Sequence, residues 1–340
     1  MKNQKSGFDY LTKKFLQLPN IEKIEYIMKT EKGFICSVEM SDGYEFKINA
    51  YVILRAFPSD VMQLIDKQDK REGVSVIISP YISDRTALIC RENSMGYFDY
   101  AGNCWFVGHS LYMFEKGNSN PQPKEYKAIS VFEQSSVVSS VILRELFVDV
   151  SKKWRIKSLA ESAKCSIGQV SKVVNYLADN AWVEKTADGY VLADPESLLK
   201  AWSDVYGKKK MQSYSCYSLD NITVIENKLG FLKNEMGIQS YLTGLAGGVR
   251  YAPVVRYNKV YMYISPEDIQ ESIDYLGMKE VESGANVVIF PLENDSYIID
   301  SRIINGTMVV SPVQVYLDSM QLKARGEEMA EAVLRKEIIK

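Results

Sequence analysis

The stretch from Ser135 to Asp194 constrains the fold most, because several elements with distinct signatures follow one another there. Apolar residues at helical spacing predict a helix over Ser135–Leu146 and a second, shorter helix over Ile156–Ala163. Ser166 and Gln169 then have the spacing of a capping box, in which each side chain bonds the backbone amide of the other residue. The stretch therefore predicts three helices in succession, the third of which opens at Ser166.

A hairpin is predicted directly after the third helix. Two short strand-like runs, from Trp182 and from Tyr190, flank Asp188-Gly189, a dipeptide suited to the positive φ of a hairpin turn. Three helices followed by a two-stranded hairpin resemble a winged helix-turn-helix domain, which we assign to residues 128–195. In such domains the third helix enters the major groove of DNA, and its N-terminal half faces the base edges.

The resemblance to a winged helix implies which side chains contact DNA. We expect contacts in the groove from the third helix and phosphate contacts from lysines beside it. The candidates in the groove are Ser166, Gln169, Ser171 and Lys172, and those for phosphates are Lys157 and Lys185. The alternative is a winged helix that contacts only protein.

Composition limits the class of protein. The 340 residues, 46% hydrophobic and 25% charged, are typical of an ordinary globular protein with two or three domains. A net charge of -2 argues against a histone-like, non-specific nucleic-acid binder but leaves room for one local basic surface. No long apolar run and no signal pattern occur, so we expect a cytoplasmic protein without a membrane span.

Histidine and cysteine usage argues against several kinds of catalytic and metal site. His109 is the only histidine, which rules out histidine-rich metal sites and predicts a structural or surface residue. The five cysteines are scattered without any C-x-x-C pair, so we predict free thiols that form neither a disulfide set nor a zinc site. No cofactor is expected.

The remaining chain predicts an α/β (α+β) protein. Residues 1–115 alternate strand-like and helical runs, residues 116–127 are a polar linker with two prolines, and residues 196–340 form a second α/β domain. In that last domain we expect a helix over Ile238–Leu245 and a strand over Ala252–Arg256. Glycines 244–248 suggest a phosphate loop, but they lack its Lys-Ser/Thr ending, and no buried strand is expected before them.

Two segments, Pro80–Phe106 and Val309–Leu334, resemble AbiEi-like antitoxins of type IV toxin–antitoxin systems. The resemblance implies an N-terminal module similar to the restriction-endonuclease fold. It also implies a C-terminal domain associated with toxin neutralisation and cooperative DNA binding. In the first segment, the residues that match the family are Asp99, Gly102 and Asn103. We interpret these three residues as a structural turn, with a ligand or DNA contact as the alternative.

The endonuclease-like module raises the possibility of catalysis. Glu45-Phe46-Lys47 has the E-x-K pattern with which such nucleases hold a divalent metal and activate water. Hydrolysis needs a second acidic ligand, and the preceding strand offers only Glu39. We therefore predict an inactive module with no bound metal and no enzyme activity.

Three functions follow from these observations. The first is a DNA-binding antitoxin that binds double-stranded DNA of its own promoter, represses its operon and opposes a nucleotidyltransferase toxin, directly or indirectly. The second is a metal-dependent DNA nuclease that uses Glu45 and Lys47 and is targeted by the winged helix. The third is a regulator whose tyrosine-bearing C-terminal domain binds a small molecule. A palindromic operator would require a dimer or cooperative monomers.

Overall fold

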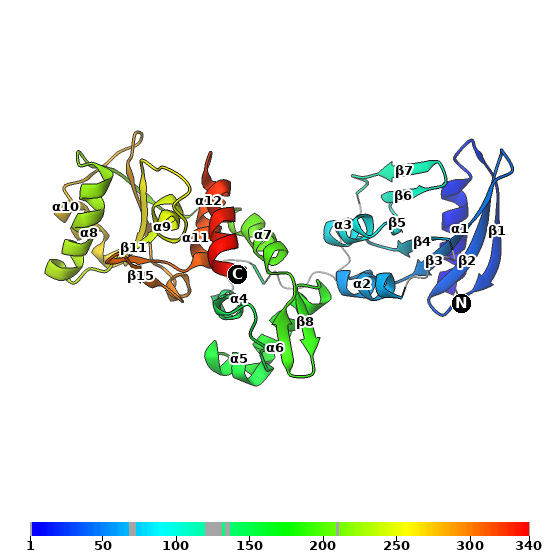
Figure 1. Ribbon diagram of the computed structural model, residues 1–340, viewed down its shortest axis with the longest axis horizontal. Coiled ribbons are helices and arrows are strands. Elements are labelled where there is room, and N and C mark those ends of the chain that lie inside the picture. The colour runs from blue at the N-terminus through cyan, green and yellow to red at the C-terminus, as the bar shows by residue number, and fades with distance from the viewer. Residues whose placement is uncertain (1, 68–72, 120–130, 133–136, 209–210, 340) are drawn as a thin grey trace. The chain divides into compact units, whose positions relative to one another are not determined.

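The structure is a computed structural model of the chain and describes residues 2–67, 73–119, 131–132, 137–208 and 211–339. They form two compact units, residues 1–129 with 177–181, and residues 130–176 with 182–340. Each unit contains a seven-stranded sheet, and the second also contains a two-stranded sheet (Figure 1). The predicted mixed α/β class is therefore confirmed. Of the predicted linker, residues 120–127 lie outside the described residues, as do residues 128–130 and 133–136 of the predicted winged helix.

The N-terminal unit is built on one sheet whose strands follow the order of the chain. Strands β3, β4 and β5 pair in parallel, and the strands on either side of them pair antiparallel. The strands are β1 (Ile21–Lys29), β2 (Gly33–Met40), β3 (Glu45–Val52), β4 (Val74–Ser79), β5 (Gly96–Asp99), β6 (Cys104–Gly108) and β7 (Leu111–Glu115).

Helices cover this sheet through two separate apolar cores. Helix α1 (Lys2–Phe15) contributes Leu11 and Phe15 to a core with the buried side chains of β2, β3, β4, β5 and β6. Helices α2 (Pro58–Asp66) and α3 (Asp84–Glu92) form a second core with Ile77 and Tyr97. Alternate residues of β4 join different cores, Val76 and Ile78 the first and Ile77 the second, as expected for a strand buried on both faces.

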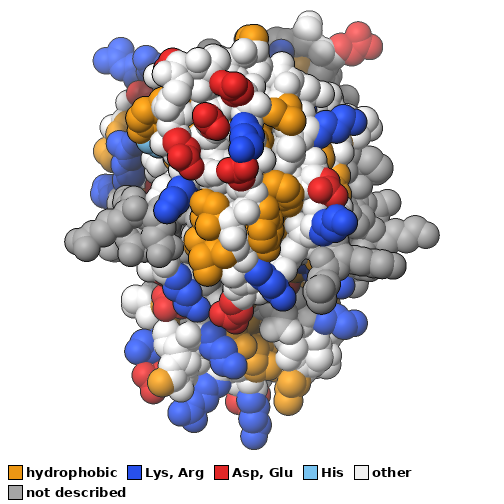
Figure 2. Space-filling view, turned by 90° about the vertical axis from the view of Figure 1, so that its right-hand side faces the viewer, with side chains coloured by type: hydrophobic (Ala, Val, Ile, Leu, Met, Phe, Trp, Pro, Cys, Tyr) orange, Lys and Arg blue, Asp and Glu red, His pale blue; other side chains and the backbone are white. Residues whose placement is uncertain are grey.

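Strand β1 forms one edge of the N-terminal sheet and exposes apolar side chains. Tyr26, Ile27 and Met28 are exposed there. Figure 2 views the molecule from the side where β1 lies in Figure 1 and shows apolar side chains among charged ones. Charged residues in β1, such as Lys23 and Glu25, are of the kind that discourages further strand pairing at a sheet edge.

The three helices and hairpin expected from the sequence come next, and all of them except the last residues of α6 belong to the second unit. They are α4 (Val137–Val148), α5 (Ile156–Ser162), α6 (Ile167–Asp179), β8 (Val183–Thr186) and β9 (Gly189–Leu192). We call this set the helix–hairpin module. Its apolar spacing explains the packing, since Val170, Val173 and Val174 of α6 are buried.

The hairpin turn differs from the predicted one by a single residue. Thr186 pairs with Gly189, so Ala187 and Asp188 form the tip and Gly189 already belongs to β9. Trp154 bridges to Tyr190 through two backbone hydrogen bonds of 2.7 and 2.8 Å, which adds a short third segment to the hairpin. Gly189 has a φ of 144°, and a Cβ there would lie 2.5 Å from the carbonyl oxygen of Trp154. The close approach of this third segment therefore requires glycine at position 189.

The C-terminal part of the second unit follows the module through helix α7 (Pro195–Tyr206). Its sheet has the order β13-β10-β14-β12-β11-β16-β15, and one core joins it to the surrounding helices. The strands are β10 (Tyr214–Tyr217), β11 (Tyr241–Thr243), β12 (Val260–Ile264), β13 (Lys279–Glu280), β14 (Val287–Pro291), β15 (Arg302–Ile304) and β16 (Thr307–Val309). The helices are α8 (Ile222–Met236), α9 (Gly244–Tyr251), α10 (Ile269–Tyr275), α11 (Pro312–Ser319) and α12 (Gly326–Val333), with η3 (Pro266–Asp268), η4 (Asp295–Ile298) and η5 (Leu334–Ile338).

Two sequence predictions in this part were wrong. Residues 238–245 are not a helix, because they contain the short strand β11 and the start of α9, and residues 252–256 do not form a strand. A buried strand therefore does precede the glycines at 244–248, and these glycines lie in a helix. A Cβ at Gly247 would lie 2.9 Å from the carbonyl oxygen of Leu242, so close packing of α9 on β11 accounts for this glycine.

Other local predictions hold. Ser311 caps α11 by accepting a hydrogen bond from the amide of Gln314, and Pro312 occupies the first turn.

The five cysteines are free thiols, of which only Cys165 is not fully buried. His109 is exposed in the turn between β6 and β7, where its ring stacks on Phe46. Within the described part of the chain, no helix has the length and apolar character needed to cross a bilayer.

Replacement of Gly189 tests the hairpin geometry. Gly189→Ala should lower the free energy of unfolding by about 1–3 kcal/mol, because its backbone conformation and the Trp154 carbonyl both exclude a Cβ. Gly168→Ala is the matched control, since its Cβ would meet nothing within 4 Å and alanine favours a helix by about 0.5–1 kcal/mol. Urea unfolding followed by tryptophan fluorescence measures both. Equal effects of the two variants would contradict this account of the hairpin.

Candidate nucleic-acid interface

The N-terminus of α6 is held by a complete capping box. The backbone amide of Gln169 donates to Oγ of Ser166 (3.2 Å), and the amide of Ser166 donates to Oε1 of Gln169 (3.1 Å). The Ser166 hydroxyl also donates to the same Oε1 at 2.9 Å. Both side chains are exposed, but their polar atoms already bond one another. Their first role in this structure is therefore to fix the start of α6.

The solvent face of α6 carries the remaining predicted contact residues. Lys172 is exposed one turn beyond the capping box, and Ser171 is half-buried. Asn175 is exposed one turn further along, and Gly168 and Ile167 are exposed near the start of the helix. The side chains best placed for contact along this face are therefore Lys172 and Asn175.

Cations are concentrated in the helix–hairpin module. Residues 137–192 contain eight Lys and Arg against six Asp and Glu, whereas the whole chain has a net charge of -2. Lys157 on α5 and Lys185 on β8 are both exposed, and neither forms an ion pair with any described residue. Lys153, by contrast, pairs with Asp188 at the hairpin tip (3.2 Å). The module therefore has local positive charge available for a phosphate backbone.

The sequence analysis missed several exposed residues of the module. Lys164 lies in the turn before α6 with a φ of 49°, and Lys152 lies over the ring of Trp154 at 3.5 Å. Lys153 and Arg155 flank Trp154 and are exposed as well. The sequence pattern that could have indicated these residues is the run Lys-Lys-Trp-Arg, in which basic residues flank an aromatic one.

Asp99, Gly102 and Asn103 form a closed turn after β5. Both carboxylate oxygens of Asp99 accept hydrogen bonds from Asn103, one from its backbone amide and one from its side chain, each 2.8 Å long. Gly102 has a φ of 105° and donates its amide to the Asp99 carbonyl oxygen (3.1 Å), to which the Tyr10 hydroxyl also donates. The Asn103 side chain in addition exchanges two hydrogen bonds with the backbone of Asn118. These contacts close the turn on itself and join it to the backbone at Asn118.

Glu45 and Lys47 lie on β3 with exposed side chains. Glu45 stands opposite Glu39 and Lys47 opposite Ser37 in the β2–β3 register, so Glu39 is the acidic residue nearest to Glu45 along that ladder. Among the described residues, no group of three or more His, Cys, Asp or Glu side chains could hold a metal ion.

A buried arginine connects the module to the C-terminal sheet. Arg144 of α4 is only 2% exposed, and its Nη2 donates to Oε1 of Gln314 on α11 (2.6 Å). Its guanidinium lies 5.2 Å from the ring centroid of Trp202 on α7 and 5.7 Å from that of Tyr297. Burial lowers the pKa of Arg144, and the nearby Asp318 carboxylate opposes that shift.

The opposite charge is Asp318, one turn beyond Gln314 on α11. Its carboxylate accepts hydrogen bonds from the Gln314 side chain (2.7 Å), from the hydroxyls of Tyr206 and Tyr263, and from Thr243. Burial raises the pKa of Asp318, and these four donors favour the charged form and limit the shift. Arg144, Gln314 and Asp318 thus form a continuous buried polar chain that joins α4 and α11, and Tyr206 connects it to α7.

A double-mutant cycle tests this polar chain. Arg144→Met and Asp318→Asn should each lower the free energy of unfolding by about 1–3 kcal/mol, because each removes one member of a buried hydrogen-bonded chain and leaves the groups bonded to it unsatisfied. The double variant should lose about 0.5–3 kcal/mol less than the sum of the two. The exposed pair Lys153–Asp188 is the control, for which coupling should stay within about 0–1 kcal/mol. Strictly additive losses for Arg144 and Asp318 would show that they do not interact.

Comparison with known proteins agrees with the resemblance seen in the sequence. Residues 191–339 match a family described as "Transcriptional regulator, AbiEi antitoxin, Type IV TA system". The match covers the end of β9, helix α7 and the whole C-terminal sheet with its helices, and it includes the second resembling segment, Val309–Leu334. A search of curated proteins found no match. The match confirms that this chain resembles the AbiEi antitoxin family of transcriptional regulators of type IV toxin–antitoxin systems.

Proposed function

We propose that this protein is a DNA-binding transcriptional regulator that binds the DNA upstream of its own gene and represses its operon. The observation that carries the proposal is the helix–hairpin module, joined through a buried polar chain to a region that matches antitoxin regulators. The order of three helices and a hairpin, with the third helix capped and exposed, is that of a winged helix-turn-helix. We assign the module this role at residues 128–195.

In the proposed complex, α6 lies in the major groove with its N-terminal half toward the bases. Lys172 is placed to contact a guanine edge or a phosphate, and Ser171 and Asn175 offer polar groups beside it. The capping box already uses the Ser166 hydroxyl and the Gln169 side-chain oxygen to hold the start of α6. Ser166 and Gln169 can therefore contact DNA only through side-chain donors and acceptors that the capping box does not use. Lys157 and Lys185 bind phosphates on either side of the groove.

We further propose that the protein acts as the antitoxin of a type IV system and opposes a nucleotidyltransferase toxin. This proposal rests on the family description of residues 191–339. The N-terminal module is assigned no catalytic role, because the surroundings of Glu45 and Lys47 supply no metal-binding cluster among the described residues. The nuclease alternative is therefore not favoured.

Binding titrations with variants of the module test the DNA-reading surface. The wild-type chain should bind DNA upstream of its gene more tightly than a scrambled duplex. Lys172→Ala should weaken binding to the upstream DNA by about 1–3 kcal/mol if Lys172 contacts a base. Lys157→Ala and Lys185→Ala should weaken binding to both duplexes, and each should reduce the slope of log K against log salt by about 0.9.

Lys233→Ala is the matched control for these variants, since Lys233 is an exposed lysine on α8, outside the module. Lys233→Ala should leave the affinity for both duplexes and the slope of log K against log salt almost unchanged, because it removes only one charge far from the proposed DNA-binding surface. Equal, weak and steeply salt-dependent binding of the wild type to both duplexes would contradict sequence-specific reading by α6.

A reporter fused to the upstream region tests autoregulation in cells. Expression of the wild-type chain should lower the reporter signal, and Lys172→Ala should restore much of it because operator occupancy falls. Lys233→Ala should repress like the wild type. Equal reporter signals with and without the wild-type protein would refute the proposed repression. The antitoxin role would then rest only on whether the protein restores growth of cells that express the toxin.

A further inference from the structure

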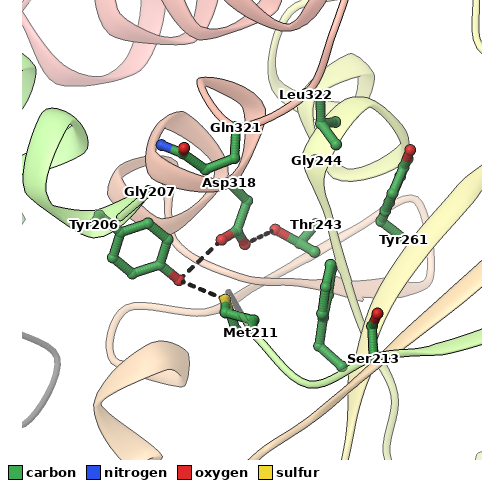
Figure 3. Close-up of a pocket in the computed structure, with 11 residues that line it drawn as sticks. Tyr206, Gly207, Met211, Ser213, Thr243, Gly244, Tyr261, Asp318, Gln321 and Leu322 are labelled. Atoms are coloured by element: carbon green, nitrogen blue, oxygen red, sulfur yellow. Dashed lines mark hydrogen bonds between the residues drawn. The ribbon is translucent and has the colours of Figure 1, made fainter. Parts of the chain in front are cut away.

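The C-terminal part of the second unit contains a cavity of about 300 Å³ beside the buried polar chain. It lies between the end of α7, the start of α9, helix α11 and strands β12 and β14 (Figure 3). Among its lining residues are Tyr206, Thr243, Tyr261, Phe290 and Asp318. The volume is at the lower end of the range of small-molecule sites, which suits a ligand of a few rings at most.

One wall of the cavity is aromatic. Tyr261 on β12 and Phe290 on β14 belong to neighbouring parallel strands, and their rings stack with centroids 6.3 Å apart and planes inclined by 14°. Both side chains are half-buried and line the cavity, so ring surface is available to a ligand. Such a wall favours a flat, aromatic ligand, because stacking on a base or similar ring needs no specific hydrogen-bond pattern.

The cavity also contains a buried carboxylate. Asp318 is 7% exposed, and Figure 3 shows its carboxylate directed between Thr243 and Tyr206, which both donate to it. Its other donors, Tyr263 and Gln314, are not among the residues that line the cavity, so they approach from the protein side.

The charge of the lining restricts the ligand further. Within the described part of the chain, the cavity lining includes Asp318 and no Lys, Arg or His. A carboxylate in such surroundings favours N–H donors and disfavours phosphate or carboxylate groups.

We propose that this cavity binds a nucleobase or nucleoside that bears an exocyclic amino group. The base stacks against Tyr261 and Phe290, and its amino group donates to Asp318 in place of the Tyr206 hydroxyl. Carboxylates accept from base amino groups in this manner. Of the two donors on the cavity side, Tyr206 is the one with alternative acceptors. Its hydroxyl also lies 3.4 Å from the sulfur of Met211 and 3.5 Å from the hydroxyl of Tyr263, and its oxygen accepts a hydrogen bond from the Gln314 side chain at 2.8 Å. The site itself does not depend on the proposed DNA-binding function.

This exchange makes a distinctive prediction for Tyr206. In the wild type the ligand has to displace the Tyr206 hydroxyl from Asp318, so the two donors compete for one acceptor. Tyr206→Phe removes the competitor and should raise ligand affinity, whereas a residue that only supports the fold would lower it or leave it unchanged. Tyr261→Ala removes half of the aromatic wall and should lower affinity.

Isothermal titration of the full chain without DNA, with adenosine as the probe and inosine as its matched control, tests the proposal. Inosine has a carbonyl oxygen where adenosine has the amino group, so it should bind at least about tenfold more weakly. Tyr261→Ala should weaken adenosine binding at least about tenfold, and Tyr206→Phe should strengthen it severalfold. Tyr217→Ala, at an exposed side chain of β10 outside the cavity lining, should have no effect. Thermal unfolding of each variant establishes that it is folded.

The outcomes separate clearly. Saturable adenosine binding with this order of variants supports the site. Absence of saturable binding by the folded wild type, equal affinity for inosine, or no change in Tyr261→Ala would each overturn the proposal. Because no DNA is present, a failure of the proposed operator binding has no influence on this result.

Discussion

The buried charge of Arg144 is the constraint on which the second unit depends. A guanidinium removed from water destabilises a fold unless opposite charge and hydrogen-bond acceptors accompany it. Gln314 accepts one hydrogen bond from Nη2 and links it to the Asp318 carboxylate, and Trp202 and Tyr297 present their ring faces to the cation, while Nε and Nη1 have no acceptor among the described residues. Arg144 comes from α4 and Asp318 from α11. The contacts that stabilise the buried guanidinium therefore form only when the helix–hairpin module packs against the C-terminal part of the second unit.

This arrangement has consequences for how α6 could be presented to DNA. A recognition helix needs a rigid base, and the module obtains one from α4 and α7, both of which contact the polar chain. The capping box fixes the first turn of α6, and the Trp154 bridge fixes the hairpin. The same chain ends at Asp318, where the proposed ligand would bind, so the hydrogen bonds that hold α4 and α7 also reach the proposed ligand site.

Local rules explain which parts of the structure were predictable. The capping box at Ser166 and the Ser311-Pro312 start of α11 are short-range patterns, and the structure has both. Strand β11 was missed because three residues are too few for a period-two pattern, and the glycines after it have low intrinsic helix propensity although they form part of α9. In both cases tertiary packing decided the outcome.

The polar chain and the cavity could not be predicted, since their residues are far apart in sequence. Arg144 follows apolar residues in a helical pattern and would ordinarily be expected at the surface, whereas it is buried against Gln314, 170 residues away. Asp318 and Tyr206 meet across 112 residues. Among the predicted DNA contacts, the sequence indicated the helix, its capping box and the lysines, and the structure adds that the Ser166 hydroxyl also donates to the Gln169 side chain.

The most direct test of the central claim is hydrogen–deuterium exchange of the full chain with and without DNA from upstream of its gene. The account predicts slower exchange on DNA binding in residues 164–175, which include the first turns of α6, and in the hairpin at residues 183–192. A scrambled duplex should give weaker protection of these segments. Protection confined to the N-terminal unit, or none in α6 while DNA is bound, would contradict the claim that the helix–hairpin module reads DNA.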